Sequence, residues 1–205
     1  MTGFSDILNK IIADILTALY QPFWFSILAA VLFMFFYLYV KERGLKKVIH
    51  TWIDSFRFSS TFRRLFLLAF YTMMILMRTL LNRSMWANPV SDVMGGWLLY
   101  DSKGELTTEP LENIILMIPF TALLLWALKK RMTNLVTIKA VVWVGTKYAF
   151  LLSVMIEFLQ LFLRLGTFQL SDIFYNALGG LLGGLCYYVA HRVKNERENK
   201  GKNNT

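Results

Sequence analysis

Three side chains able to do chemistry lie in an otherwise apolar stretch of the chain, residues 143–165. They are Glu157, Gln160 and Arg164, and with Ser153 they follow an i, i+4, i+7, i+11 spacing that places all four on one face of a helix. Charged groups are costly in hydrocarbon, so we do not expect this face to contact lipid. We therefore take it as a candidate functional site. If the protein is an enzyme, Glu157 is the best candidate for its general acid or base.

Further polar side chains occur at the ends of other apolar stretches. Two pairs, one starting at Arg78 and one at Asp172, are each spaced four residues apart and so share a helix face. We expect the arginines to recognise phosphate or carboxylate, and the acids to orient them or to meet an amine. The candidate ligand-binding residues are Arg78, Asn82, Asn113, Glu157, Gln160, Arg164, Asp172 and Asn176.

The composition indicates which kind of fold has to position these residues. Of the 205 residues 56% are hydrophobic and the mean hydropathy is +0.48, which is too apolar for an ordinary soluble domain. A membrane-spanning helix needs about 20 apolar residues. The sequence therefore predicts an all-α fold, a polytopic membrane helical bundle occupying residues 22–191. Its five transmembrane helices are expected at 22–40, 65–81, 113–128, 140–163 and 173–190.

The distribution of lysine and arginine predicts the orientation of this bundle. The net charge of +9 comes from basic segments 41–64 and 129–147 and from a basic tail, residues 192–205, whereas segment 83–112 is acidic. The positive-inside rule then places the N-terminus outside and the C-terminus in the cytoplasm. This topology brings every candidate residue to the outer part of the membrane. It also accounts for the basic charge without a nucleic-acid partner.

Three segments outside the spans carry predictions of their own. Residues 1–21 form an amphipathic helix that either lies on the outer leaflet or packs against the bundle, and both alternatives stay open. The basic and aromatic segment 41–64 predicts an amphipathic helix on the inner leaflet. The tail from Lys194 onward lacks periodicity and is expected to be disordered.

Each polar residue also has an explanation that requires no ligand. The amides can hold helices together, Glu157 can form a buried ion pair with an arginine, and Arg164 can extend to the interface. Asp172 stands where the first turn of a helix favours an acid. Close helix packing is the role we expect for the glycines of two overlapping small-xxx-small pairs, Gly179, Gly180, Gly183 and Gly184.

Four motifs give residues 70–190 a family resemblance. They are R-T-L-L-N at 78–82, E-N-I-I-L-M-I-P-F at 112–120, S-V-M-I-E-F-L-Q-L-F-L-R at 153–164 and S-D-I-F-Y-N-A-L-G-G-L-L-G at 171–183. In this order and spacing the chain resembles the VanZ-like family of bacterial membrane proteins, whose founding member is associated with teicoplanin resistance. The resemblance implies a polar core with contributions from Glu157, Gln160, Arg164, Asp172, Asn176, Arg78 and Asn113.

One departure from the family pattern bears on the chemistry. Many relatives carry paired acids where this chain has Ser171-Asp172. The difference weakens any mechanism that needs two adjacent carboxylates, such as a metal site, and we expect neither a metal nor another cofactor.

The resemblance implies a role in glycopeptide or lipoglycopeptide resistance at the bacterial plasma membrane. The expected partner is a membrane lipid, a lipid-linked cell-wall precursor or the lipoglycopeptide itself, bound in an outward-facing polar cleft. The alternative is an intramembrane enzyme that modifies a lipid or wall precursor by acyl or phosphoryl transfer, although His50, Cys186 and His191 fall on the inner side. A transporter is disfavoured because the polar groups are confined to one side, and the oligomeric state stays open.

Overall fold

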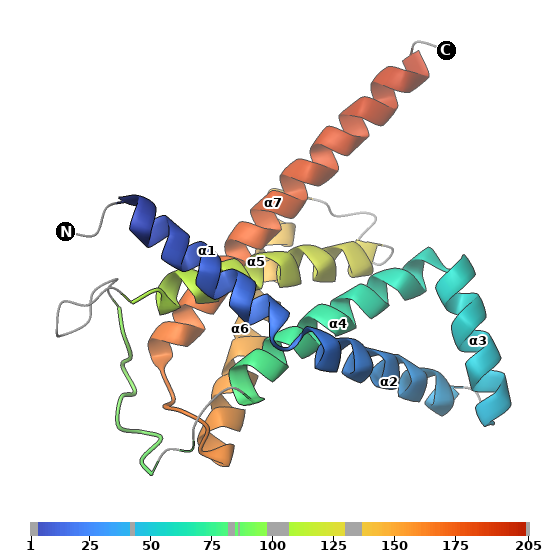
Figure 1. Cartoon of the computed structure of the whole chain (residues 1–205). Coiled ribbons are helices and arrows are strands. Elements are labelled where there is room, and N and C mark those ends of the chain that lie inside the picture. The colour runs from blue at the N-terminus through green and yellow to red at the C-terminus, as the bar shows by residue number, and fades with distance from the viewer. Residues whose placement is uncertain are drawn as a thin grey trace.

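The computed structural model describes residues 4–41, 44–81, 85, 87–97, 107–129 and 137–203, which contain seven α-helices (Figure 1). Five of these helices, α2, α4, α5, α6 and α7, are long and apolar enough to cross a membrane, which confirms the five predicted spans. The helix bounds are α1 Phe4–Tyr20, α2 Phe23–Lys41, α3 Leu45–Phe58, α4 Ser60–Leu81, α5 Glu109–Leu128, α6 Ile138–Leu163 and α7 Leu170–Asn203.

The helices extend beyond the apolar stretches from which they were predicted. Hydropathy detects only the apolar part of a helix, so α4 and α5 begin several residues earlier than predicted, at Ser60 and Glu109. The largest difference is at α7, which continues to Asn203, and the prediction of a disordered tail is therefore wrong. Polar contacts at i, i+4 support this last part of the helix. The Arg192 guanidinium lies 3.1 Å from the Glu196 carboxylate, and the Asn195 amide lies 3.3 Å from the His191 ring.

The centre of the bundle is formed by α5, α6 and α7, with α4 packed along one side. One buried apolar cluster joins Ile75 of α4 to Met117 of α5 and Ile156 of α6. A second cluster attaches α2 and α3 to α4. Large apolar side chains of α2, among them Trp24 and Phe36, are exposed and suit contact with lipid.

Glycines bring α7 into close contact with both of its neighbours. A Cβ atom at Gly179 would lie 2.3 Å from the Ile114 carbonyl oxygen of α5. A Cβ at Gly180, on the next face, would lie 2.4 Å from the Ala149 Cβ of α6. Both separations are shorter than side-chain contacts allow, so the predicted role of these glycines in close packing is confirmed.

The two predicted amphipathic segments are both helical. In α3, Trp52 stacks on Phe56 with ring centroids 5.3 Å apart and packs against the second cluster. The helix α1 crosses α5 (Figure 1), where Asp14 lies 3.1 Å from the Thr108 hydroxyl. Its Leu16 is 61% exposed, so α1 touches the bundle while leaving apolar surface uncovered. The positions of α1 and α3 on the leaflets stay predictions.

Candidate functional site

A polar cavity of about 210 Å³ opens where α4 ends and where α5 and α7 begin. Three helix ends meet there because α4 runs opposite to α5 and α7. Of the candidate residues, the structure brings together Arg78, Asn113 and Asp172 at this cavity. The described residues that line it are Arg78, Thr79, Glu109, Glu112, Asn113, Leu116 and Asp172.

Arg78 forms an ion pair with Glu112 across the cavity wall. The exposed fractions of the two side chains are 22% and 13%, so both are largely removed from solvent. Glu112 lies in the first turn of α5, where the helix dipole favours an acid. An acid at the start of the neighbouring helix, Glu112, therefore orients Arg78. A contribution of Glu157 or Asp172 to the position of Arg78 stays a prediction.

The ion pair continues into a chain of polar contacts that reaches α1. The Thr108 hydroxyl lies 2.5 Å from the second oxygen of Glu112 and 3.1 Å from an oxygen of Asp14. A hydroxyl has one proton, so it donates to one of these carboxylates at a time. This chain couples the position of α1 to the cavity.

The remaining wall of the cavity joins α5 to α7. The Asn113 amide donates a hydrogen bond of 2.9 Å to the Asp172 carboxylate, which is 9% exposed. Asp172 lies in the first turn of α7, where the helix dipole favours an acid. The same carboxylate can stabilise this helix terminus and line the cavity, so the two roles are compatible.

A second polar cluster lies between α6 and its neighbouring helices and does not line the cavity. Glu157 is 2% exposed, and its carboxylate accepts the backbone N–H of Gln169 at 2.8 Å. The Gln160 amide donates to the Thr79 carbonyl oxygen at 2.9 Å, and the Asn176 amide donates to the Ser153 hydroxyl at 2.8 Å. Gln160 and Asn176 therefore act as interhelical links, and Glu157 holds the connection between α6 and α7.

That connection is also tied to the described part of the long loop before α5. The backbone N–H of Phe168 donates to the Pro89 carbonyl at 2.8 Å, and that of Leu170 donates to Val93 at 2.9 Å. The Gln169 side chain reaches Asp92 at 3.0 Å. Residues 87–97 therefore cover the 164–170 connection, a role for which the sequence carried no signal.

Arg164 does not belong to the polar face that its spacing predicted. The helix α6 ends at Leu163, and Arg164 follows as its C-cap in the left-handed conformation, with φ 56° and ψ 37°. Its side chain is exposed. The i+11 position is therefore wrong for Arg164, because the helical periodicity stops one residue before it.

The left-handed backbone conformation of Arg164 allows a test of its placement outside the site. We expect Arg164→Gly to keep full function and to raise the free energy of unfolding by about 0.5–1 kcal/mol, because glycine adopts this conformation without a Cβ penalty. Thermal unfolding of the purified protein measures the change. Loss of function at unchanged stability would instead return Arg164 to the site.

The predicted site residue Asn82 lies outside the described residues. Glu109 and Glu112 line the cavity although neither is among the predicted ligand-binding residues. Their signal was present as two acids three residues apart, around Pro110, at the start of an apolar helix facing a span that ends in arginine. Within the described ranges, no three His, Cys, Asp or Glu side chains are grouped so that they could hold a metal ion.

Comparison with known proteins gives one match. The family model described as VanZ/LLP1 matches residues 23–191, which include the first four spans, most of the fifth and every described cavity residue. A search of curated proteins and a search of solved structures each returned no match.

Proposed function

The chain belongs to the VanZ/LLP1 family, and on that premise we propose that its polar cavity binds the head group of a cell-envelope amphiphile and thereby contributes to glycopeptide resistance. The observation that carries this proposal is the largely buried Arg78–Glu112 pair on the wall of an open cavity. Ionisable groups inside a multi-pass membrane protein are costly and usually serve a ligand or an ion.

The charges around the cavity favour a ligand that carries an amine. Among the described residues of the lining, one guanidinium, from Arg78, faces three carboxylates, so their formal charge is −2. An ammonium group would offset the excess of acid, and Arg78 would pair with a neighbouring phosphate or carboxylate of the same ligand. An amine-bearing lipid or a lipid-linked cell-wall precursor has this chemistry, and so does an amine-bearing lipoglycopeptide.

The size of the cavity limits how much of the ligand enters. Its volume of about 210 Å³ is below the range of about 300–1,000 Å³ found for pockets that enclose drug-sized molecules. We therefore propose that only part of the head group enters, while the acyl chains stay in the membrane beside the exposed apolar surface of the helices.

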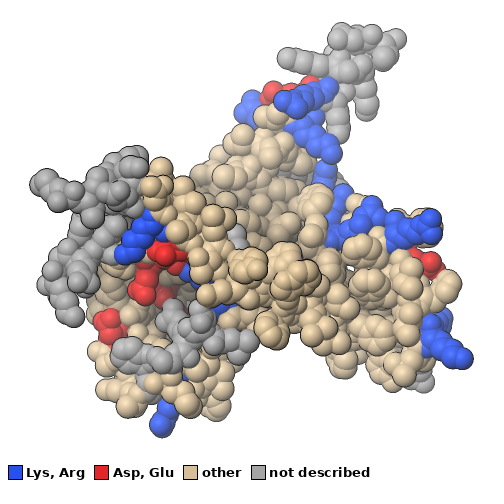
Figure 2. All heavy atoms as spheres, in the orientation of Figure 1, with Lys and Arg blue, Asp and Glu red and all other residues tan. Residues whose placement is uncertain are grey.

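The proposed location is the outer leaflet of a bacterial plasma membrane, with the N-terminus outside. Figure 2 supports this orientation, because basic side chains gather near the end of α7 and near α3 and the start of α4, away from the cavity. Acidic and basic side chains lie side by side near the start of α5, and uncharged surface separates the two regions. Anionic lipid favours basic residues on the cytoplasmic side.

Binding is favoured over catalysis by the positions of the two groups that an enzyme would use. Glu157 does not line the cavity, and its carboxylate accepts a backbone N–H. Thr79 supplies a hydroxyl to the lining, but this hydroxyl donates to the Ile75 carbonyl of its own helix at 2.8 Å. A nucleophile and a base within reach of each other are therefore not provided by these residues.

We expect Arg78→Glu to reduce resistance to that of cells without the protein. The change places a fourth acid at the cavity and leaves Glu112 without its partner, at a cost of about 1.5–3 kcal/mol. Teicoplanin susceptibility of expressing cells, measured beside the amount of protein in the membrane fraction, gives the result.

The double variant Arg78→Glu/Glu112→Arg separates ligand binding from folding. It restores an ion pair, so we expect protein levels to recover while resistance stays low, because the two charges have exchanged positions. The matched control is Arg192→Glu/Glu196→Arg, which reverses an exposed pair on the tail of α7 and should change neither quantity. Recovery of resistance in the Arg78/Glu112 double variant would show that the pair is structural and would overturn the proposal.

A further inference from the structure

The contact between α5 and α7 has a constant register at the glycines. Gly179 faces Ile114 and Gly183 faces Ile118, so each residue of α7 lies opposite the residue of α5 that precedes it by 65 positions. Continued by one turn at a time, the same register sets Ala122 opposite Tyr187 and Trp126 opposite His191. It ends with Lys129 opposite Lys194.

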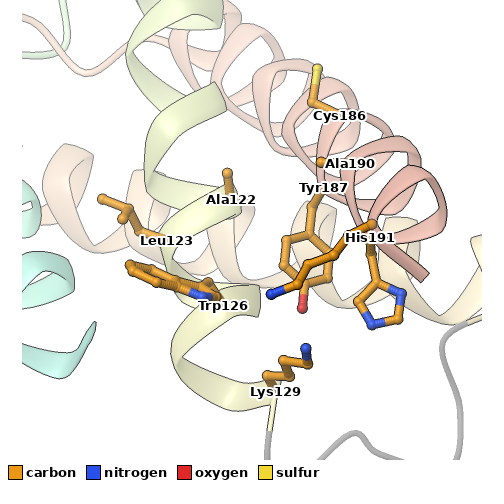
Figure 3. Close-up of a pocket in the computed structure, with 9 residues that line it drawn as sticks. Ala122, Leu123, Trp126, Lys129, Cys186, Tyr187, Ala190 and His191 are labelled. Atoms are coloured by element: carbon orange, nitrogen blue, oxygen red, sulfur yellow. The ribbon is translucent and has the colours of Figure 1, made fainter. Parts of the chain in front are cut away.

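The close contact cannot continue beyond Gly183. The next positions on the same stripe of α7, four and eight residues on, are Tyr187 and His191, whose rings stack with centroids 6.1 Å apart. Bulky side chains at these positions separate two helices that glycines held together. A groove of about 440 Å³ results, and Figure 3 shows Trp126 of α5 and Tyr187 of α7 beside it.

The groove changes from apolar to cationic along its length. The part nearer the middle of the bundle is lined by Ala122, Leu123 and Cys186. The part nearer the basic end is lined by Lys129, His191 and Lys194. Seven residues of helix separate Ala122 from Lys129, which corresponds to about 10 Å along the axis. No acidic residue is among the described residues that line it.

Arg64 adds a further cation at this end of the bundle. Its guanidinium lies over the Trp126 ring, 5.0 Å from the centroid. The Nε atom of Arg64 is buried and has no hydrogen-bond partner among the described residues. Arg64 is not among the residues that line the groove, so what it adds is positive charge near this end of it.

We propose that this groove binds one anionic phospholipid from the leaflet at the basic end of the bundle. One acyl chain lies against Ala122 and Leu123, and the phosphate lies between Lys129 and Lys194, within reach of Arg64. The apolar and cationic parts match the two chemical parts of such a lipid in the order in which a leaflet presents them. The site is separate from the polar cavity, which lies at the opposite ends of α5 and α7.

Native mass spectrometry of the purified full chain with added lipid tests this proposal. The probes are phosphatidylglycerol and phosphatidylcholine with identical acyl chains. We expect the wild-type protein to retain phosphatidylglycerol preferentially. We expect Lys129→Gln/Lys194→Gln to weaken that binding about 30-fold, because each basic residue near a membrane surface contributes about fivefold and two are removed.

Two further variants make the test specific. Ala122→Phe fills the apolar part without changing charge and should also reduce phosphatidylglycerol binding. Lys46→Gln/Lys139→Gln removes two exposed basic residues of α3 and α6 outside the groove and should leave binding within about twofold of wild type. Equal retention of both lipids, an equal loss in the Lys46/Lys139 control, or unchanged binding in Lys129→Gln/Lys194→Gln would each overturn the proposal.

Discussion

Gly179→Ala is expected to unfold or to misassemble the bundle although it adds a single methyl group. The new Cβ would lie 2.3 Å from the Ile114 carbonyl oxygen and 2.9 Å from the Met117 Cβ, so both the backbone and a core side chain of α5 would have to move. Overpacking of this kind costs about 1–3 kcal/mol and more where the backbone cannot yield. The gain of about 1 kcal/mol in helix propensity from glycine to alanine does not offset this cost.

The measurement is thermal unfolding in detergent together with the monodisperse fraction on size-exclusion chromatography. Gly96→Ala is the matched control, because a Cβ at Gly96 meets nothing within 4 Å. We expect the control to behave as wild type. Equal stability of the Gly179 variant and the control would mean that α5 and α7 do not pack through this glycine. The offset of 65 residues between facing positions of the two helices would then also be wrong.

The second large effect is expected at Glu157, where two substitutions should differ. Glu157→Leu removes the acceptor of the partly buried backbone N–H of Gln169. An unsatisfied buried donor costs about 1–3 kcal/mol. The 164–170 connection would loosen, and with it the start of α7, which carries Asp172. Glu157→Gln keeps the shape and an acceptor oxygen, so we expect it to retain most of the stability and the resistance.

Amide hydrogen exchange of residues 164–170, measured beside resistance, distinguishes the possible roles of Glu157. Faster exchange and lost resistance in Glu157→Leu, with both near wild type in Glu157→Gln, are the results expected for a residue that positions the connection. If Glu157→Gln abolished resistance while exchange and stability were unchanged, the ionisable carboxyl itself would be required. The enzyme alternative would then be favoured over the binding proposal.

The helices α5 and α7 carry two separate polar regions, one at each proposed binding site. Their first turns carry Glu112 and Asp172 at the cavity, and their last parts carry Lys129 and Lys194 at the groove. Between these ends the glycine contact holds the helices at a fixed separation. The acids at the two helix starts and Lys129 at the end of α5 agree with the helix dipole. Lys194 lies nine residues before the end of α7 and is outside the range of this effect.

Properties that depend on local composition and spacing were predictable from the amino-acid sequence. Five spans follow from apolar length, and the close contacts of α7 follow from glycines four residues apart. The gathering of Arg78, Asn113 and Asp172 follows as well, because each lies at the end of a span and alternating spans bring those ends to one side. None of these inferences required knowledge of which side chain meets which.

The partners of the polar side chains were not predictable in this way, because a hydrogen bond or ion pair depends on angstrom-scale positions that periodicity does not specify. Arg78 forms an ion pair with Glu112, since α5 presents its first turn to the end of α4. Arg164 leaves the polar face because α6 ends one residue earlier, where the connection to α7 bonds to residues 89 and 93. Such long-range contacts determine where a helix ends, and no local window of the sequence contains them.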